Sequence, residues 1–277
     1  MNTHRWIDLG RRMGTVLLMP VLMLVGGCAT MGVNQGDVNL VSLNEEWQMG
    51  QQLERQLAGQ LKLVNDAATV AYVNDIGQRI VRQTELAGAP WTFHVVNNPE
   101  INAFNVPGGH VYVNTGLIKA AGNASELAAV MAHEISHGVS RHATERISKV
   151  YGLNLGAGLV LGDNPSTLKK IAAQLAAGGL VAKFSRSDER EADHLGIRYM
   201  YDAGYDPRGM AGMFGKLLET RKRRPGSVEQ FFSTHPLAED RIASARAEAN
   251  ALPRKSGLIA NDGRLATIQQ RVMRYQG

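Results

Sequence analysis

The segment 133–137 reads His-Glu-Ile-Ser-His, which places two histidines four residues apart and a glutamate directly after the first. Residues four apart lie on one face of an α-helix, so His133 and His137 can bind the same metal ion. Glu134 is turned by about 100° from that face, so it can reach a water molecule at the metal instead. This pattern is typical of zinc peptidases, in which zinc lowers the pKa of water and the glutamate accepts its proton. We therefore predict one Zn²⁺ per chain, with Glu134 as the general base.

A catalytic zinc site needs a third protein ligand and one open position. An extended form of the motif would have a glycine three residues and a histidine six residues after His137, but Ser140 and Ala143 occupy those positions. That subclass is therefore excluded. His142 lies five residues after His137 and would point away from the metal on a continuous helix, so we interpret it as a surface histidine.

The acidic stretch 188–193 offers a better third ligand. Glu189 and Asp193 are again four residues apart, so they share one helical face. We expect Glu189 to bind the zinc and Asp193 to accept a hydrogen bond from the far nitrogen of a ligand histidine, which orients its ring. Glu191 would point away, and we interpret it as a surface or salt-bridging residue. The alternative for the whole stretch is an ordinary charged helix.

Hydrophobic spacing places these residues among several helices and a few short strands. The expected helices span residues 43–60, 67–83, 126–141, 168–181, 188–201, 208–219 and 237–250. The expected strands span residues 91–96, 101–106 and 110–114, with a turn at 107–109 and a short helix from 116. Ser125 is the expected N-cap of the helix that carries the first motif. The pattern predicts an α+β fold that is mainly helical, with a small β-sheet next to the active-site helix.

The first 27 residues have the features of a processing signal. Three arginines precede an apolar stretch at 13–25, which is too short for an ordinary transmembrane helix. The following Gly26-Gly27-Cys28 resembles a bacterial lipobox, whose cysteine is lipidated and becomes the first residue of the mature chain. The alternative is a plain secretory signal with an incidental cysteine. We expect lipidation at Cys28, and the resemblance, with Ala29 rather than aspartate next in the chain, implies sorting to the outer membrane.

Composition excludes several other kinds of site and partner. Cys28 is the only cysteine, so once it is acylated the chain has no thiol for a disulfide or a cysteine-ligated metal. Charged residues make up 20% of the chain, which is typical of a globular protein. The formal charge of +5 is a mild excess, and no basic stripe with interleaved aromatics indicates nucleic-acid binding. We interpret the basic run 221–224 as a solvated helix end, with contact to anionic lipid as the alternative.

These features divide the chain into four segments. We expect a lipoprotein signal peptide at 1–27, a tether at 28–44, a zinc metallopeptidase domain at 45–250 and a peripheral C-terminal segment at 251–277. Inside the domain, residues 151–163 form an apolar stretch that is too short to span a membrane. We expect this stretch to be buried or to face substrate.

The two metal motifs together resemble those of a known family. His133-Glu134-x-x-His137 followed by Glu189-x-x-Ala192-Asp193 resembles the gluzincin zinc metallopeptidases that include the CAAX prenyl endopeptidases and HtpX. The layout is most like that of the soluble periplasmic lipoprotein members, such as BepA and LoiP. The resemblance covers about residues 45–250 and implies a zincin-like metallopeptidase domain. Further matching stretches are Asn102-Ala103-Phe104 through Pro107-Gly108-Gly109, Val113-Asn114-Thr115-Gly116-Leu117, Ser185-Arg186, and Ser233-Thr234-His235-Pro236 with Arg241.

The resemblance also implies roles for residues other than the zinc ligands. His235 or Arg241 would stabilise the oxyanion of the tetrahedral intermediate. Alternatively, His235 would fill the open position of the zinc and hold the enzyme latent. The family's strand beside the active site implies that an extended peptide substrate pairs there, with a purely structural hairpin as the alternative. The expected substrate contacts are with Asn102, Val111, Val113 and Asn114.

These features favour a zinc-dependent endopeptidase of the bacterial cell envelope. We expect it to hydrolyse misfolded or mis-assembled periplasmic and outer-membrane proteins from the periplasmic face of the outer membrane. Its membrane contact would be the lipidated Cys28, and its partners would be unfolded or misassembled envelope polypeptides. The substrate class comes from the resemblance and the expected location. The alternative is a chaperone-like outer-membrane assembly factor with a mainly structural zinc site.

Overall fold

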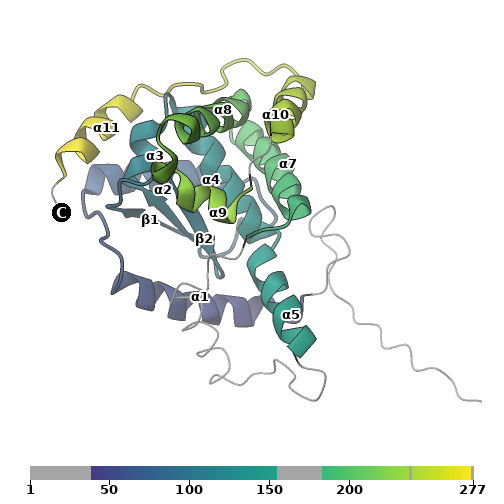
Figure 1. Cartoon of the computed structure of the whole chain (residues 1–277). Coiled ribbons are helices and arrows are strands. Elements are labelled where there is room, and N and C mark those ends of the chain that lie inside the picture. Colours follow the sequence, from purple (N-terminus) through teal and green to yellow (C-terminus); the bar gives the residue numbers. More distant parts are fainter. Residues whose placement is uncertain (1–38, 155–182, 237–238, 276–277) are drawn as a thin grey trace, which may run out of the picture.

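The computed structural model describes residues 39–154, 183–236 and 239–275. Some predicted features lie outside these ranges: the signal peptide, lipidation at Cys28, most of the tether at 28–44, the helix at 168–181 and most of the apolar stretch at 151–163. The described residues form helices around a small sheet, which confirms the predicted α+β class (Figure 1).

The predicted elements that lie in the described ranges occur in the predicted order (Figure 1). Before the sheet come α1 (Leu43–Ala58) and α2 (Ala67–Val81). The strands are β1 (Thr92–Val96), β2 (Ala103–Val106) and β3 (His110–Asn114). After them come α3 (Thr115–Ala120), α4 (Ala124–Val139), α5 (His142–Asn154), α7 (Arg186–Asp202) and α8 (Arg208–Arg223). The last elements are η2 (Pro225–Ser227), α9 (Glu229–Thr234), α10 (Glu239–Ala251) and α11 (Leu265–Arg274). The structure thus adds α5, η2, α9 and α11 to the predicted elements.

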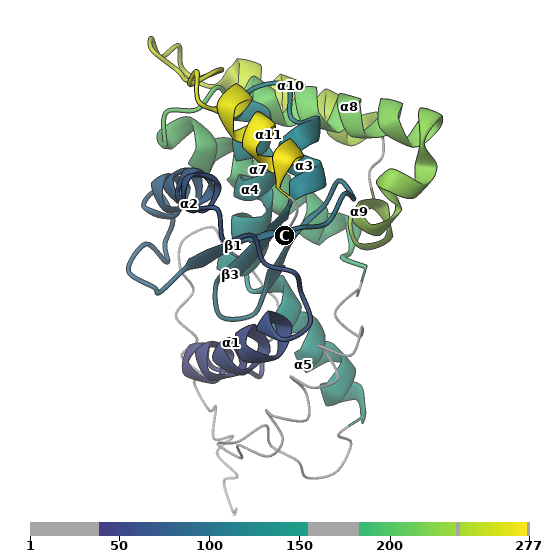
Figure 2. The ribbon, with the colours of Figure 1, turned by 90° about the vertical axis from the view of Figure 1, so that its left-hand side faces the viewer.

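The three strands form a mixed sheet in the order β1-β3-β2. β1 pairs with β3 in parallel, and β2 pairs with β3 in antiparallel orientation. β3 is therefore the central strand of the described sheet, and β2 is an outer strand. α1 lies across one face of the sheet, while α2 and α4 lie on the other side (Figures 1 and 2).

Side chains of the strands alternate between these two layers, as the period of a β-strand requires. On β3, Val111 and Val113 join the larger hydrophobic core together with α2 and α4. Tyr112 between them joins a smaller core with Met49 and Leu53 of α1. The sheet therefore separates two cores, and it keeps α1 on the opposite side from α4.

The turn between β2 and β3 determines how closely α1 approaches the sheet. Gly108 and Gly109 have φ angles of 87° and 74°, a left-handed backbone that glycine adopts without strain. At Gly50 in α1, a Cβ atom would lie 2.4 Å from the carbonyl oxygen of Pro107 and 2.7 Å from Cα of Gly108. Any larger residue at position 50 would clash with this backbone, so glycine allows α1 to rest directly on the turn.

α4 is enclosed by other elements, and all of its 16 residues are buried. It packs against α2, α7, α8 and β2. A helix in such a place needs apolar side chains on every face, and Leu127-Ala128-Ala129-Val130-Met131 supplies them. The N-cap is not the predicted Ser125 but Asn123, whose side chain accepts a hydrogen bond from the N–H of Glu126. The Ser125 hydroxyl donates to the Asn123 side chain instead, so it supports the cap from inside the helix.

Two segments are more tightly packed than predicted. Val41, at the end of the expected tether, is 1% exposed and joins the smaller core. Within the expected peripheral segment 251–277, α11 buries Leu265, Ile268 and Val272 in the larger core. These three side chains recur at helical spacing, so one face of α11 is apolar and packs on the domain.

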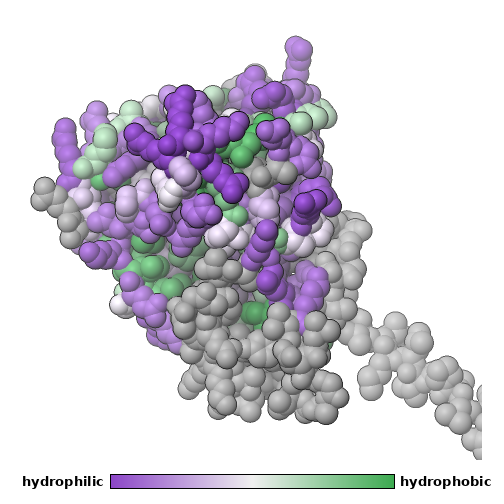
Figure 3. Space-filling model, viewed as in Figure 1, coloured by the Kyte–Doolittle hydropathy of each residue, from purple (hydrophilic) through white to green (hydrophobic). Residues whose placement is uncertain are grey.

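None of the helices in the described ranges is long and apolar enough to cross a membrane. Figure 3 shows a mostly hydrophilic surface over the described part of this face, with hydrophobic residues in small groups. α8 continues through Arg223, beyond its predicted end at 219, so most of the basic run belongs to the helix. There Arg223 pairs with Glu219 at 2.7 Å, and the Arg221 guanidinium lies over the ring of Phe232.

Candidate metal centre

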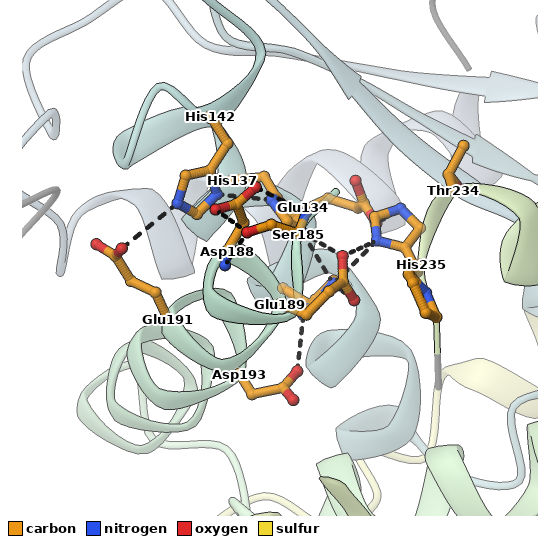
Figure 4. Close-up of polar contacts among 12 residues, drawn as sticks. Glu134, His137, His142, Ser185, Asp188, Glu189, Glu191, Asp193, Thr234 and His235 are labelled. Atoms are coloured by element: carbon orange, nitrogen blue, oxygen red, sulfur yellow. Dashed lines mark hydrogen bonds and ion pairs between the residues drawn. The ribbon is translucent and has the colours of Figure 1, made fainter. Parts of the chain in front are cut away.

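α4 and α7 pack side by side at the centre of the site. Gly196 of α7 allows the close approach, because a Cβ atom there would lie 3.2 Å from the backbone nitrogen of His133. α7 begins after the N-cap Ser185, which forms a capping box with Asp188. This cap fixes the start of the helix, and the first turn directs Glu189 towards α4 (Figure 4).

Four side chains from three parts of the chain converge on one point (Figure 4). Nε2 of His133 lies 3.1 Å from Nε2 of His137 and 3.3 Å from Nδ1 of His235. Oε1 of Glu189 lies 3.4 Å from Nε2 of His137 and 2.9 Å from Nδ1 of His235. One donor atom from each of the four lies within 4.8 Å of the others. The two metal motifs and the late histidine therefore meet in space.

All four side chains are closed off from solvent, with exposed fractions between 0% and 2%. Burial lowers the pKa of His137 well below its usual value, so its imidazole is neutral, the form that binds metal ions. Burial opposes a charge on Glu189, but the neighbouring His235, His137 and His133 together keep the pKa of its carboxyl well below the usual range. His137 and Glu189 are therefore in the neutral and ionised forms, respectively, that bind metal ions.

This donor set fits a zinc ion. Zinc prefers four ligands in a tetrahedral arrangement, which puts neighbouring donor atoms about 3.3 Å apart. Four of the donor separations, those of Nε2 of His133 from Nε2 of His137 and Nδ1 of His235 and those of Oε1 of Glu189 from the same two atoms, lie between 2.9 and 3.4 Å, and all four donors lie within 4.8 Å of one another. His133, His137 and Glu189 supply the two imidazoles and one carboxylate found in catalytic zinc sites, and Nδ1 of His235 lies where a fourth ligand would bind.

Asp193 of α7 and Arg241 of α10 lie next to the donors. Oδ1 of Asp193 lies 3.0 Å from Nδ1 of His133, the ring nitrogen that faces away from the other donors. The Arg241 guanidinium donates two hydrogen bonds of 2.7 Å to Asp193, one of 2.5 Å to Glu189 and one to the carbonyl oxygen of Pro236. Because its donors face these partners, the structure favours a positioning role for Arg241 over the expected contact with an oxyanion.

His142 is not the surface histidine that the sequence predicts. It is 2% exposed, and its Nδ1 lies 2.8 Å from Nδ1 of His137. Its Nε2 lies 3.5 Å from Glu191, which also accepts a hydrogen bond of 3.0 Å from the Ser140 hydroxyl. The prediction assumed a continuous helix, but α4 ends before Arg141, whose φ of 58° is left-handed. The backbone turns at this residue, and the side chain of His142 points to His137 (Figure 4).

Phe184 is a second residue that sequence reasoning missed. Its ring stacks on His137 with centroids 4.0 Å apart and planes inclined by 21°. Its N–H donates a hydrogen bond of 3.0 Å to the carbonyl oxygen of Thr234, directly before His235. The only signal in the sequence is its place next to Ser185, where the family resemblance resumes. Phe184 therefore fixes the plane of one donor ring and joins the two segments that carry Glu189 and His235.

Glu134 lies beside the four donors and is 1% exposed (Figure 4). Its Oε2 accepts a hydrogen bond of 3.1 Å from the backbone N–H of Asn105 in β2. Its Oε1 has no hydrogen-bond partner among the described residues, and Nε2 of His235 lies 3.4 Å away. Burial raises the pKa of Glu134. One carboxylate oxygen is thus held by the sheet, and the other is available to accept a proton.

The four residues predicted to contact substrate are buried in the structure. β3 is the central strand, so both of its edges are already paired, and Val111 and Val113 are 0% exposed in the larger core. Asn102 and Asn114 are also buried, and the N–H of Asn114 donates to the carbonyl oxygen of Asn102. The strand edge beside the site belongs to β2, where the N–H of Asn105 points away from β3 towards α4.

Comparison with known proteins agrees with this geometry. Residues 67–249 match Peptidase family M48. The chain is 36% identical over 232 residues to the beta-barrel assembly-enhancing protease of Escherichia coli strain K12, covering 80% of this chain and 47% of that protein. It is 33% identical over 222 residues to the beta-barrel assembly-enhancing protease of Yersinia pestis, covering 76% of this chain and 45% of that protein. It is 31% identical over 212 residues to a mitochondrial metalloendopeptidase of Schizosaccharomyces pombe, covering 76% of this chain and 62% of that protein. The chain thus spans about half the length of the two beta-barrel assembly-enhancing proteases.

Proposed function

The chain belongs to peptidase family M48, and from that premise we propose that it is a zinc-dependent endopeptidase with Glu134 as its general base. It is a metallopeptidase by family. One observation carries the proposal. His133, His137 and Glu189 converge beside a buried carboxylate of which one oxygen has no hydrogen-bond partner among the described residues.

Zn²⁺ would be held by His133 and His137 through their Nε2 atoms and by Glu189 through its carboxylate. A bound zinc ion lowers the pKa of a water molecule and polarises the carbonyl group of a substrate. The neighbouring side chains orient the ligands before a substrate arrives. Asp193 lies against the far nitrogen of His133, and His142 lies against the far nitrogen of His137.

Glu134 would move the proton in both halves of the reaction. The N–H of Asn105 holds Oε2, which leaves Oε1 to accept the proton of the attacking water. The same oxygen then delivers that proton to the amine nitrogen as the C–N bond of the peptide breaks. Because burial raises its pKa, the carboxyl of Glu134 is a better proton acceptor than an exposed glutamate.

His235 would control access to the site. Its Nδ1 lies 3.3 Å from His133 and 2.9 Å from Glu189, in the position of a fourth ligand. With this ring in place, four protein side chains would hold the zinc, so water would have access to it only if the ring withdrew. We propose that this closed arrangement is latent. The alternative is that the withdrawn ring stabilises the oxyanion.

Replacement of His235 distinguishes these two roles. If His235 holds the enzyme latent, His235→Ala should raise basal proteolysis, measured as casein cleavage by the purified protein. Unchanged or lower activity, with zinc retained, would count against latency and favour the oxyanion role.

A peptide substrate would pair with the outer edge of β2. In the antiparallel register with β3, the backbone N–H and C=O groups of Ala103 and the C=O group of Asn105 point away from β3, whereas the N–H of Asn105 donates to Glu134. An extended peptide can add to such an edge through main-chain hydrogen bonds. Because Asn105 contacts Glu134 directly, a peptide on this edge would lie beside the general base.

The substrate class and the location of the protein are also part of the proposal. Two of its relatives are named beta-barrel assembly-enhancing proteases. We propose that the chain acts on misfolded or mis-assembled outer-membrane and periplasmic polypeptides, at the periplasmic face of the outer membrane, through a lipid on Cys28. A Cys28→Ala variant that keeps its association with outer-membrane fractions would contradict the anchor.

A second candidate function is that of a chaperone-like outer-membrane assembly factor with a mainly structural zinc. The observation in its favour is the complete set of four protein donors, because structural zinc sites have no open position. Glu134→Gln separates the two functions in cells that lack the wild-type protein. Full restoration of envelope integrity by this variant would identify assembly, and not proteolysis, as the main activity.

The zinc dependence is tested by casein cleavage with the purified protein before and after chelation. We expect cleavage to stop when a chelator removes the metal and to resume when Zn²⁺ is added back. Cleavage that is insensitive to the chelator would contradict the proposal.

A further inference from the structure

We propose that Glu54, His94 and His110 form a second metal site that takes a divalent transition ion such as Zn²⁺. The three residues come from α1, β1 and β3. Both histidines contact Glu54 of α1 and alternate along their strands with residues of the larger core, so they lie on the face of the sheet that α1 covers. Figure 2 shows α1 and α4 on opposite sides of the sheet. The two sites therefore share no residue, and the second does not depend on the proposed peptidase activity.

The carboxylate oxygen of this second site lies at ligand-like distances from both imidazoles. One donor atom from each residue lies within 4.8 Å of the other two. Nε2 of His94 lies 3.0 Å from Oε1 of Glu54, and Nδ1 of His110 lies 3.5 Å from the same oxygen. Ligands of a tetrahedral zinc lie about 3.3 Å apart, so small adjustments would suffice to bind the ion.

Strand pairing holds the two histidines in this arrangement. The parallel register places Thr92 opposite His110, and His94 follows two residues later on the same face. The Thr92 hydroxyl oxygen lies 2.7 Å from Nδ1 of His110 and 3.1 Å from Nε2 of His94. The ring of His94 also stacks on Tyr112, with centroids 4.8 Å apart. Both rings are thus fixed with one nitrogen directed at the Thr92 hydroxyl, which also lies 3.4 Å from Oε1 of Glu54 and so sits beside all three donor atoms.

α1 brings the carboxylate to the same point. Its contact with the turn at Gly50 places the helix directly on the sheet, and Glu54 is one helical turn later on the same face. His110 is 5% exposed, whereas the side chains of His94 and Glu54 are 24% and 32% exposed. The buried histidine forms the floor of the site. The open side leaves room for a water molecule as the fourth ligand.

The chemistry of the donors selects the class of ion. Two imidazoles and one carboxylate suit zinc and its first-row neighbours, whereas calcium and magnesium prefer sites built from oxygen atoms alone. A bound ion would join α1 to β1 and β3. Since it would bind only the folded arrangement, it would stabilise the folded state.

The test is the zinc content of the untagged, full-length protein and of its His94→Gln variant after equilibration with the same zinc buffer. We expect the wild type to hold one equivalent more than His94→Gln. We also expect added zinc to raise the Tm of the wild type by more than that of the variant. A second variant, Glu54→Gln, keeps the shape of the side chain and should lose the same equivalent.

A matched control is His194→Gln, which removes a more exposed histidine whose Nδ1 lies 3.0 Å from Glu248. Within residues 39–154, 183–236 and 239–275 no third donor joins this pair, so the control should keep the zinc content of the wild type. Equal zinc content in the wild type, His94→Gln and Glu54→Gln would overturn the proposal. Loss of an equivalent in His194→Gln would also overturn it, because surface histidines would then be binding zinc non-specifically. A first centre that failed to bind zinc would lower all counts by one and leave the expected difference intact.

Discussion

Two groups of histidine and carboxylate side chains lie on opposite sides of the same small sheet. The interior group, between α4 and α7, consists of His133, His137, Glu189 and His235, with exposed fractions of 2% or less. In the outer group, between α1 and the sheet, two of the three side chains are about a quarter to a third exposed. The donor types are the same, but the surroundings differ.

The interior group is held by a set of partners that the outer group lacks. Asp193 and Arg241 orient its ligands from one side, and His142 and Phe184 orient them from the other. The contacts of the outer group include the Thr92 hydroxyl and the Tyr112 ring. The interior group also faces Glu134, a carboxylate placed to accept a proton. The ligands alone therefore predict metal binding, whereas the orienting partners and the adjacent base predict catalysis.

Removal of the Arg241 guanidinium, which lies beside the interior group, should have the largest effect on stability. Arg241→Ala leaves Asp193 and Glu189 buried without the guanidinium that pairs with both. A buried charge that loses its partner costs about 3–5 kcal/mol, so we expect Tm to fall by roughly 10 °C and activity to fall with it. Thermal unfolding measures the change. The control Arg208→Ala breaks an exposed pair with Asp206 and should shift Tm little, so equal shifts would contradict the account.

Removal of an orienting histidine should have a smaller effect that appears in metal affinity. His142→Ala takes away the partner 2.8 Å from Nδ1 of His137. Loss of such a partner lowers metal affinity or activity by about 10–100-fold, and competition with a chromophoric chelator would measure it. The counterpart in the outer group, Thr92→Val, should leave the interior centre and casein cleavage unchanged. An unchanged zinc affinity in His142→Ala would mean that His142 only fills space.

The smallest effect is expected at a surface ion pair outside both groups. Hydrogen bonds from Arg271 and Thr69 keep the pKa of Asp66 well below its usual value. A carboxyl whose pKa is lowered by folding stabilises the folded state at pH values above its unfolded-state pKa of about 3.9. This stabilisation is lost as the pH falls below that value. Arg271→Ala should therefore lower Tm by roughly 2 °C or less at pH 7. The difference from the wild type should shrink between pH 4 and pH 2, and a constant difference would contradict this assignment.

Helical periodicity was enough to predict the main side chains of the interior group. His133 and His137 on α4, and Glu189 and Asp193 on α7, are pairs four residues apart, and both segments fold as continuous helices. Each pair therefore lies on one helical face in the structure, as the spacing predicts. The mainly helical α+β class was predictable for the same reason, since each element shows its own hydrophobic period.

Features that depend on contacts between distant elements could not be predicted in this way. The burial of His142 was not predicted because the helix ends before Arg141. Arg141 has a left-handed backbone, and no glycine in the sequence indicates this. The central place of β3 depends on its parallel pairing with β1, which no local pattern reveals. The outer group was missed because Glu54, His94 and His110 come from three elements and form no motif in the sequence.

Glu134 is the residue on which the proposed chemistry depends, so its replacement is the most direct test. The measurement is the rate of casein cleavage by Glu134→Gln and by the wild type, both loaded with zinc and analysed for zinc content. We predict equal zinc content and a rate lower by about 10²- to 10⁴-fold in Glu134→Gln. A zinc-loaded Glu134→Gln variant that cleaves casein as fast as the wild type would contradict the proposed role of Glu134 and with it the proposed catalytic site.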